Sequence, residues 1–381
     1  MDAASSSVDK ARLLAADFAG RAAAHDRDAS FPFENFQALY DAGLLSLTVP
    51  RERGGLGAGM LECARVLNEV ARGCSSTALV LAMHYIQHYS IAHGRPWPKH
   101  LAELMARESV NGLGLLNVLR VEPELGSPSR GGSMATVAKR TAEGWRISGR
   151  KIYSTGLPGL KWYSVWARTE EDEPRLGTFL IPAGLPGAKI VETWDHAGLR
   201  ASGSHDLVLE NVMIPLDYEI DVRTPAEWRA GDPMGLIVHG TFVAAVYDGV
   251  ARAARDWLIE FLKNRKPANL GAALATLPRA QEIVGGIEVK LTTNTRLLES
   301  FAADYDQGRK ITMADAQALK MTITNNAVAC VEEALSLTGN HGLSRTNPLE
   351  RHLRDVLCGR VHTPQDDTIR LTAGRLALGI Q

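Results

Sequence analysis

The sequence predicts a mostly helical α+β protein in which one β domain separates two helical domains. Apolar residues recur at helical spacing over residues 7–109, and this spacing returns after about residue 232. Between these segments lie short runs of β-branched and aromatic residues separated by Gly and Pro, a pattern typical of closely spaced antiparallel strands. Because no segment alternates strand with helix, a Rossmann domain is disfavoured. We expect an N-terminal helical domain at 1–112, a middle β domain at 113–222 and a C-terminal helical domain at 223–381.

Two amphipathic patterns predict the N-terminal helices. The first comprises Ala11, Leu14, Ala15 and Phe18, and the second Met60, Cys63, Ala64, Leu67 and Val70. The longest break between them is Val-Pro-Arg-Glu-Arg-Gly-Gly-Leu-Gly at 49–57, which contains the residues that stop helices. This third of the chain therefore has the pattern of a helical bundle.

The predicted strands and the later helices follow in order. Strand-like runs lie at 145–149, 162–168, 178–182 and 206–210. Long helical patterns then cover 235–264, 278–305 and 313–338, and the last of these ends in Gly-Asn-His-Gly, which is a good helix stop. A final amphipathic helix is expected at 369–378.

Composition excludes several classes of protein. The 381 residues include 42 Lys and Arg against 43 Asp and Glu, so a net charge of −1 gives no long-range field for nucleic acid or anionic lipid. The four cysteines are scattered without CxxC spacing, which argues against a disulfide scaffold or a zinc site. His84 and His88 could pair on one helix face, but HxxxH without a third ligand is weak support for a metal. The N-terminus lacks the basic start and apolar core of a signal peptide, so a cytoplasmic protein is expected.

Five segments, in order along nearly the whole chain, resemble motifs of the acyl-CoA dehydrogenase superfamily. Val-Glu-Pro-Glu-Leu-Gly-Ser at 121–127 is similar to T-E-P-x-x-G-S, and Gly-Trp-Arg-Ile-Ser-Gly-Arg-Lys-Ile-Tyr-Ser-Thr-Gly at 144–156 is similar to G-W-x-x-N-G-x-K-x-[WY]-I-[TS]-N. The other three are Gly-Leu-Arg-Ala-Ser-Gly-Ser at 198–204, Arg265 with the later Gln281, and Gly-Asn-His-Gly at 339–342 followed by Pro-Leu-Glu-Arg-His-Leu-Arg-Asp at 348–355. The chain is therefore identified as a member of this superfamily.

The resemblance implies a homotetramer whose subunits end in a four-helix bundle and hold FAD, or alternatively FMN, between the β domain and the last helical domain. It implies a small-molecule substrate and, as redox partner, an electron-transfer flavoprotein or a flavin reductase, with no role for nucleic acid or membrane. The cofactor-binding positions carried over are Val121, Ser127, Tyr153, Thr155, Arg265, Gln281, Gly339 and Gly342.

The chemistry of several of these residues suits a flavin dinucleotide. The resemblance places Tyr153 against the flavin ring and the Thr155 hydroxyl within bonding distance of it. The guanidinium fork of Arg265 suits a pyrophosphate because it can make two charge-assisted bonds to phosphate oxygens. Gly339 and Gly342 would let the backbone approach that pyrophosphate closely, from a neighbouring subunit.

The catalytic carboxylate of the dehydrogenases is missing from both of its usual places. Dehydrogenation of an acyl thioester needs a base that removes the α-proton while hydride leaves the β-carbon. At the first place, after the Arg-Asp motif, this chain has Thr363. At the second place, His-Gly-Thr-Phe-Val at 239–243 contains no acidic residue.

Two functions therefore remain open at this point. In the first, the protein oxidises the CH–CH group of an acyl-CoA-like substrate with a displaced base, and Asp366 or Asp367 is the candidate. In the second, it resembles the dibenzothiophene monooxygenase-like enzymes of the same fold, which use reduced flavin and O₂. Residues 351–364 are similar to their R-H-x-R-[ND]-A-x-x-x-x-x-H-[DT]-P, with His362 on the catalytic His and His84 as a second candidate. Histidine suits this role because it can hold or release a proton near neutral pH.

A third hypothesis is an inactive flavin-binding homologue that kept the fold and lost the base. A ruined flavin site would support it. The retained Tyr153, Thr155 and Arg200 favour an active enzyme instead.

Overall fold

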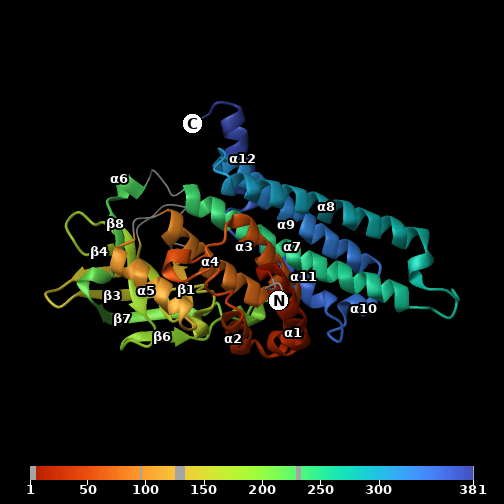
Figure 1. Ribbon diagram of the computed structural model, residues 1–381, viewed down its shortest axis with the longest axis horizontal. Coiled ribbons are helices and arrows are strands. Elements are labelled where there is room, and N and C mark those ends of the chain that lie inside the picture. Colours follow the sequence, from red (N-terminus) through yellow and green to blue (C-terminus); the bar gives the residue numbers. More distant parts are fainter. Residues whose placement is uncertain (1–5, 95–96, 125–133, 229–232, 381) are drawn as a thin grey trace.

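The computed structural model describes residues 6–94, 97–124, 134–228 and 233–380 and confirms the helical, β, helical order. Figure 1 shows the sheet at one end of the molecule, the N-terminal helices in the middle and the long C-terminal helices reaching to the other end. The change from helix to strand falls between α5 and β1, near the expected 112/113, and the return to long helices follows β8.

The N-terminal helices are α1 Ser7–Asp28, α2 Phe33–Asp41, α3 Met60–Gly73, α4 Ser75–His93 and α5 Lys99–Val110. The Ser6 side chain caps α1 by accepting the backbone N–H of Asp9. Helix α4 is buried on nearly every side, because it packs on α3, on α7 and on strand β1. It therefore lies where the N-terminal domain meets the other two.

The sheet has eight strands: β1 Leu116–Leu119, β2 Val137–Arg140, β3 Trp145–Lys151, β4 Trp162–Thr169, β5 Leu176–Pro182, β6 Ala188–Val191, β7 Asp206–Ile214 and β8 Glu219–Arg223. The order is β6-β7-β3-β2-β4-β5-β8, and β1 pairs with β4. Most neighbours are antiparallel, as expected, but β1/β4 and β2/β4 are parallel. These two pairs bring the chain after β1 alongside the middle of the sheet, where the flavin motifs were predicted.

The C-terminal domain contains α7 Pro233–Asn264, α8 Pro278–Asp306, α9 Met313–Ser336, α11 Leu349–Leu357 and α12 Asp366–Ala377, with the short α10 Asn340–Leu343 between α9 and α11. The predicted helices therefore exist, and Thr312 with Asp315 forms a capping box at the start of α9. Helix α7 is long and apolar enough to cross a membrane by composition, but 78% of its most apolar window is buried inside the fold. Its position between α3, α4 and α9 is that of a core helix.

Two consecutive residues of α11 tie the three domains together. Asp355 accepts hydrogen bonds from the Leu199 backbone N–H at 2.7 Å and from the Ser75 hydroxyl at 2.6 Å. Arg354 pairs with Asp26 of α1 at 2.6 Å and donates to the carbonyl of Ala197. The Arg-Asp motif thereby fixes the turn that follows α11 relative to the β domain.

Candidate functional site

An exposed aromatic surface lies on the β domain directly after β3. Tyr153 is 54% exposed although its backbone φ is +54°, a conformation that is costly for a bulky residue and is usually kept for a function. Its ring meets Trp194 and His196 edge-on, and these two rings stack with centroids 3.8 Å apart. Three aromatic groups together form a platform on which a planar ring system can pack.

Hydroxyl groups lie beside this platform. Ser204 Oγ donates to Thr155 Oγ1 at 3.1 Å and also bonds Ser202 Oγ at 2.8 Å. The Thr155 oxygen therefore already accepts a hydrogen bond, and its own O–H can donate to another group. The neighbouring Ser154 Oγ is buried and has no hydrogen-bond partner among the described residues. An exposed ring, a free donor and an unpartnered hydroxyl fit the edge and face of a flavin, as predicted for Tyr153 and Thr155.

A second group of side chains gathers where α7, α9 and the turn after α11 meet. The Tyr247 hydroxyl lies 2.5 Å from His362 Nδ1, and Tyr247 is fully buried. Lys320, also fully buried, donates from Nζ to the carbonyl of Gly359 at 3.0 Å. The turn that carries His362 is thus held from both helices. His239 lies two helical turns before Tyr247 on the same face of α7.

Both histidines in this group are neutral at physiological pH. Burial, with a smaller effect of the nearby His239 and Lys320, lowers the pKa of His362 to about 3. Burial lowers the pKa of His239 to about 4, again with help from nearby cations, Arg120 and Lys320. By surface area the residue His362 is half-buried, whereas Tyr247 and Lys320 are fully buried. A neutral imidazole can donate one hydrogen bond and accept one.

The candidate carboxylate Asp366 begins α12 and is engaged with other groups. Asn325 Nδ2 donates to its Oδ2 at 2.6 Å, and the charge of Lys320 lies close enough to interact with it. Its second oxygen, Oδ1, is buried without a hydrogen-bond partner among the described residues. Thr363 is exposed and supplies no acid–base group.

His84 is occupied by backbone bonds rather than open to a ligand. Its Nε2 donates to the carbonyl of Leu45 at 3.0 Å, and its Nδ1 accepts the N–H of Leu116 at 3.2 Å. The ring is fully buried, and burial lowers its pKa to about 4. These contacts join α4 to β1, so the structure gives His84 a packing role and no open nitrogen for the predicted catalytic one.

Of the other predicted cofactor residues that the structure describes, only Val121 lies near Tyr153 within the single chain. The Val121 carbonyl accepts the N–H of Ile152 beside the platform, whereas Ser127 lies outside the described residues. Arg265 follows the far end of α7, where a cavity of about 390 Å³ also includes Trp257 and Phe261. The last three predicted positions, Gln281 on α8 with Gly339 and Gly342 around the start of α10, also belong to the C-terminal domain. Their supply by a neighbouring subunit stays a prediction.

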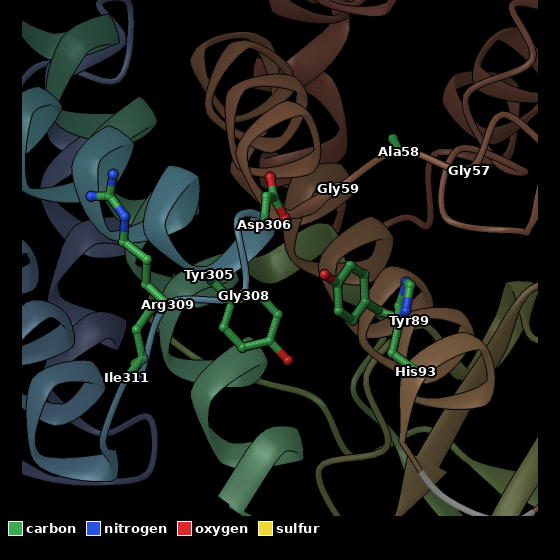
Figure 2. A pocket seen from close by; sticks show the side chains of 10 residues that line it. All are labelled: Gly57, Ala58, Gly59, Tyr89, His93, Tyr305, Asp306, Gly308, Arg309 and Ile311. Carbon is green, nitrogen blue, oxygen red and sulfur yellow. The ribbon is translucent and has the colours of Figure 1, made fainter.

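A larger cavity, of about 650 Å³, lies between the end of α4 and the α8–α9 connection (Figure 2). Tyr89 and His93 form one wall, and Tyr305, Asp306 and Arg309 form the other. The Asp306 carboxylate accepts the backbone N–H groups of Met60 at 2.6 Å and Leu61 at 3.0 Å, so it caps α3. No motif in the sequence pointed to this cavity.

The sequence analysis missed Tyr247, Trp194 and His196. The sequence signal of these residues is weak. A tyrosine in an apolar helix has the pattern of a core residue, and an aromatic pair in a loop has no fixed spacing. Only the helical periodicity of His239 and Tyr247, eight residues apart, could have placed both on the face that meets α9.

The fold and the ring-binding platform define a three-part flavoprotein oxidoreductase. Family models match nearly the whole chain: acyl-CoA dehydrogenase N-terminal domain at 6–97, middle domain at 120–212 and C-terminal domain at 241–366. The chain belongs to the acyl-CoA dehydrogenase family. The predicted family, the flavoprotein class and a flavin cofactor, FAD or FMN, are thereby confirmed.

Relatives of two kinds resemble the chain. The Bacillus subtilis (strain 168) protein YdbM, which carries the provisional name acyl-CoA dehydrogenase, is 34% identical over 364 residues, 95% of this chain and 94% of the relative. L-evernosamine nitrososynthase of Micromonospora sp. is 29% identical, and the matched region covers 94% of this chain and 86% of the length of that relative. The structure of KijD3 in complex with FMN and dTDP-3-amino-2,3,6-trideoxy-4-keto-3-methyl-D-glucose has a TM-score of 0.86 and 29% identity, covering 98% of this chain and 93% of that one.

Proposed function

We propose that the protein is a flavin-dependent enzyme that uses O₂ on a small-molecule substrate and receives its reduced flavin from a separate reductase. The observation that carries this proposal is the His362–Tyr247 pair, because His362 directly precedes Thr363, which occupies one of the two positions where the family's dehydrogenases carry their carboxylate. The function is an extension of the monooxygenase alternative that the sequence left open.

The local electrostatics support a neutral histidine that donates a hydrogen bond, rather than a carboxylate that removes a proton. A general base for a C–H proton must be open to the substrate and able to gain a proton. Asp366 is turned toward Asn325 and Lys320, whereas His362 is neutral and partly open. A neutral imidazole beside buried cations suits the stabilisation of negative charge that develops on oxygen.

A bound flavin would supply the electrons and the site at which O₂ is activated. The protein residues would then have separate tasks. Tyr153 and the Trp194–His196 stack would pack on the flavin ring, and the Thr155 hydroxyl would donate a hydrogen bond to an atom of that ring. His362 would hold a proton at Nε2, and Lys320 would keep its turn in place.

The substrate class follows from the relatives and is part of the proposal. One of them is named a nitrososynthase, and the KijD3 structure holds FMN together with a nucleotide-linked amino sugar. We therefore take nucleotide-linked amino sugars as the first substrates to test. A homotetramer in the cytoplasm, with a flavin reductase as partner, completes the proposal.

Two parallel assays test it. In the first, the flavin-loaded protein is mixed without oxygen with acyl-CoAs of several chain lengths, and the flavin absorbance is followed. In the second, the protein is supplied with reduced FMN or FAD, ¹⁸O₂ and nucleotide-linked amino sugars, and the masses of the products are measured by mass spectrometry. We expect no bleaching in the first and ¹⁸O in product in the second; rapid bleaching by an acyl-CoA would overturn the proposal.

A second function is kept because of one observation. Asp366 Oδ1 is buried without a partner, and it could take up an α-proton if the loop 361–367 adjusts on substrate binding. The resemblance to YdbM favours this acyl-CoA dehydrogenase activity. Bleaching by an acyl-CoA that disappears in Asp366→Asn and persists in His362→Gln would establish it.

A further inference from the structure

The hydroxyl of Tyr247 decides which nitrogen of His362 carries the proton. This hydroxyl is fully buried, and the structure gives it one hydrogen-bond partner, His362 Nδ1 at 2.5 Å. A buried O–H must donate to an acceptor, or it loses a bond that it would make in water. Burial raises the pKa of Tyr247 well above its ordinary value, so the hydroxyl keeps its proton.

Only one arrangement of protons satisfies both groups. Neutral imidazole has one N–H and one lone pair. If Nδ1 carried the proton, it would donate to the Tyr247 oxygen, and the Tyr247 hydroxyl proton would have no acceptor among the described residues. If Nε2 carries it, Nδ1 accepts from Tyr247 and neither group is left without a partner.

We infer that Tyr247 is a positioning residue that fixes His362 as the Nε2–H tautomer, so that the ring presents a donor to the ligand side of the site. The inference deepens the proposed function, on which its chemical meaning rests. A donor N–H stabilises negative charge on oxygen, whereas removal of a carbon-bound proton would need a lone pair at Nε2.

The packing around Tyr247 makes this geometry rigid. A Cβ at position 359 would lie 3.1 Å from Tyr247 Cδ2, so Gly359 allows the ring and the turn to approach closely. Lys320 holds the same turn through the Gly359 carbonyl. The Tyr247 ring and the imidazole are 5.6 Å apart between centroids and tilted by 45°. The turn cannot move His362 off the hydroxyl without breaking these contacts.

The tautomer can be measured without any activity assay. The full-length protein is labelled with ¹³C and ¹⁵N in histidine, and the spectrum of His362→Gln is subtracted to isolate His362 from the other ten of the 11 histidines. In the wild type at pH 7.5, we expect at least about nine-tenths of His362 as the Nε2–H form. In Tyr247→Phe, which keeps the ring and removes the hydroxyl, the Nδ1–H form should rise several-fold.

Tyr85→Phe is the matched control. Tyr85 is equally buried, and its hydroxyl donates to the Leu44 carbonyl at 2.6 Å, remote from the turn. It should leave the His362 signals unchanged. A wild-type protein with His362 mainly as Nδ1–H overturns the inference even if Tyr247→Phe fails to fold, and so does an unaltered tautomer in folded Tyr247→Phe. Acyl-CoA bleaching would refute the proposed function but would leave this result standing.

Discussion

The ion pair between Lys151 and Glu122 joins the segments that carry the first two flavin motifs, at 121–127 and 144–156, and its removal should be costly. Lys151 Nζ lies 2.6 Å from Glu122 Oε1, and both side chains are almost completely buried. Glu122 also accepts the backbone N–H groups of Ala135 at 2.7 Å and Thr136 at 3.1 Å. Tyr153 follows Lys151 by two residues, so the pair fixes the start of the platform.

The two partners are unequally supported, and this sets the order of the effects. Burial would raise the pKa of Glu122, but Lys151 and the Thr136 N–H lower it overall. Burial lowers the pKa of Lys151 to about 8, because the hydrogen bond and the charge of Glu122 offset only part of the effect of burial. Glu122→Gln therefore leaves a buried ammonium with weak support and should cost about 3–5 kcal/mol of unfolding free energy. Lys151→Met leaves a carboxylate with two N–H donors and should cost somewhat less, near the lower end of that range.

The double variant Glu122→Gln/Lys151→Met should be far more stable than the sum of the single changes, because it leaves no buried charge. Urea unfolding followed by tryptophan fluorescence reports on the β domain, and flavin titration reports on the platform. The control Lys189→Met breaks an exposed pair with Glu210 and should cost less than about 1 kcal/mol. This interpretation of the pair would be refuted if the double variant lost as much unfolding free energy as the two single variants together. It would also be refuted if Lys151→Met had the unfolding free energy of the wild type.

Three further predictions follow from the site. Thr155→Val should weaken flavin binding about ten-fold through one lost donor, with an unaltered unfolding midpoint, and equal affinity would contradict the assigned contact. Lys320→Met should release the turn at Gly359, so the steady-state turnover rate should fall clearly while the thermal unfolding midpoint changes little. The free energy of unfolding should be highest above about pH 6.5, where the buried histidines are neutral in both states. As the pH drops toward 4, it should fall by up to about 1.4 kcal/mol per pH unit for each buried histidine, because the unfolded chain then binds more protons than the folded one. A flat denaturation midpoint over that range would contradict the lowered pKa values of His84, His239, His352 and His362.

Local patterns were enough to predict the three domains. Helical periodicity placed α7, α8, α9 and α12, and β-branched runs placed β3, β4, β5 and β7, because these signals depend on neighbouring residues. The parallel pairing of β1 with β4 had no local signal, since it depends on a connection across more than 40 residues. The resemblance supplied the flavin motifs, and the structure gives Tyr153 and Thr155 a common surface.

Contacts between distant segments decided the rest of the site. His84 was predicted as catalytic, but its Nδ1 accepts a hydrogen bond from the backbone N–H of Leu116, which belongs to the β domain. Tyr247 meets His362 across 115 positions of sequence, so neither residue alone indicates the pair. The positive φ of Tyr153 is a property of the folded turn and leaves no trace in composition.

The most direct test of oxygen chemistry at His362 compares two variants in one assay. His362→Gln and Asp366→Asn are supplied with reduced flavin, O₂ and the substrate that the wild type oxygenates, at flavin concentrations that saturate each protein. Product formation should fall by roughly 10²–10⁴-fold in His362→Gln and by less than about ten-fold in Asp366→Asn. The reverse order, or product formation that is unaltered in His362→Gln, would contradict the assignment of His362 as the hydrogen-bond donor for the oxygen chemistry.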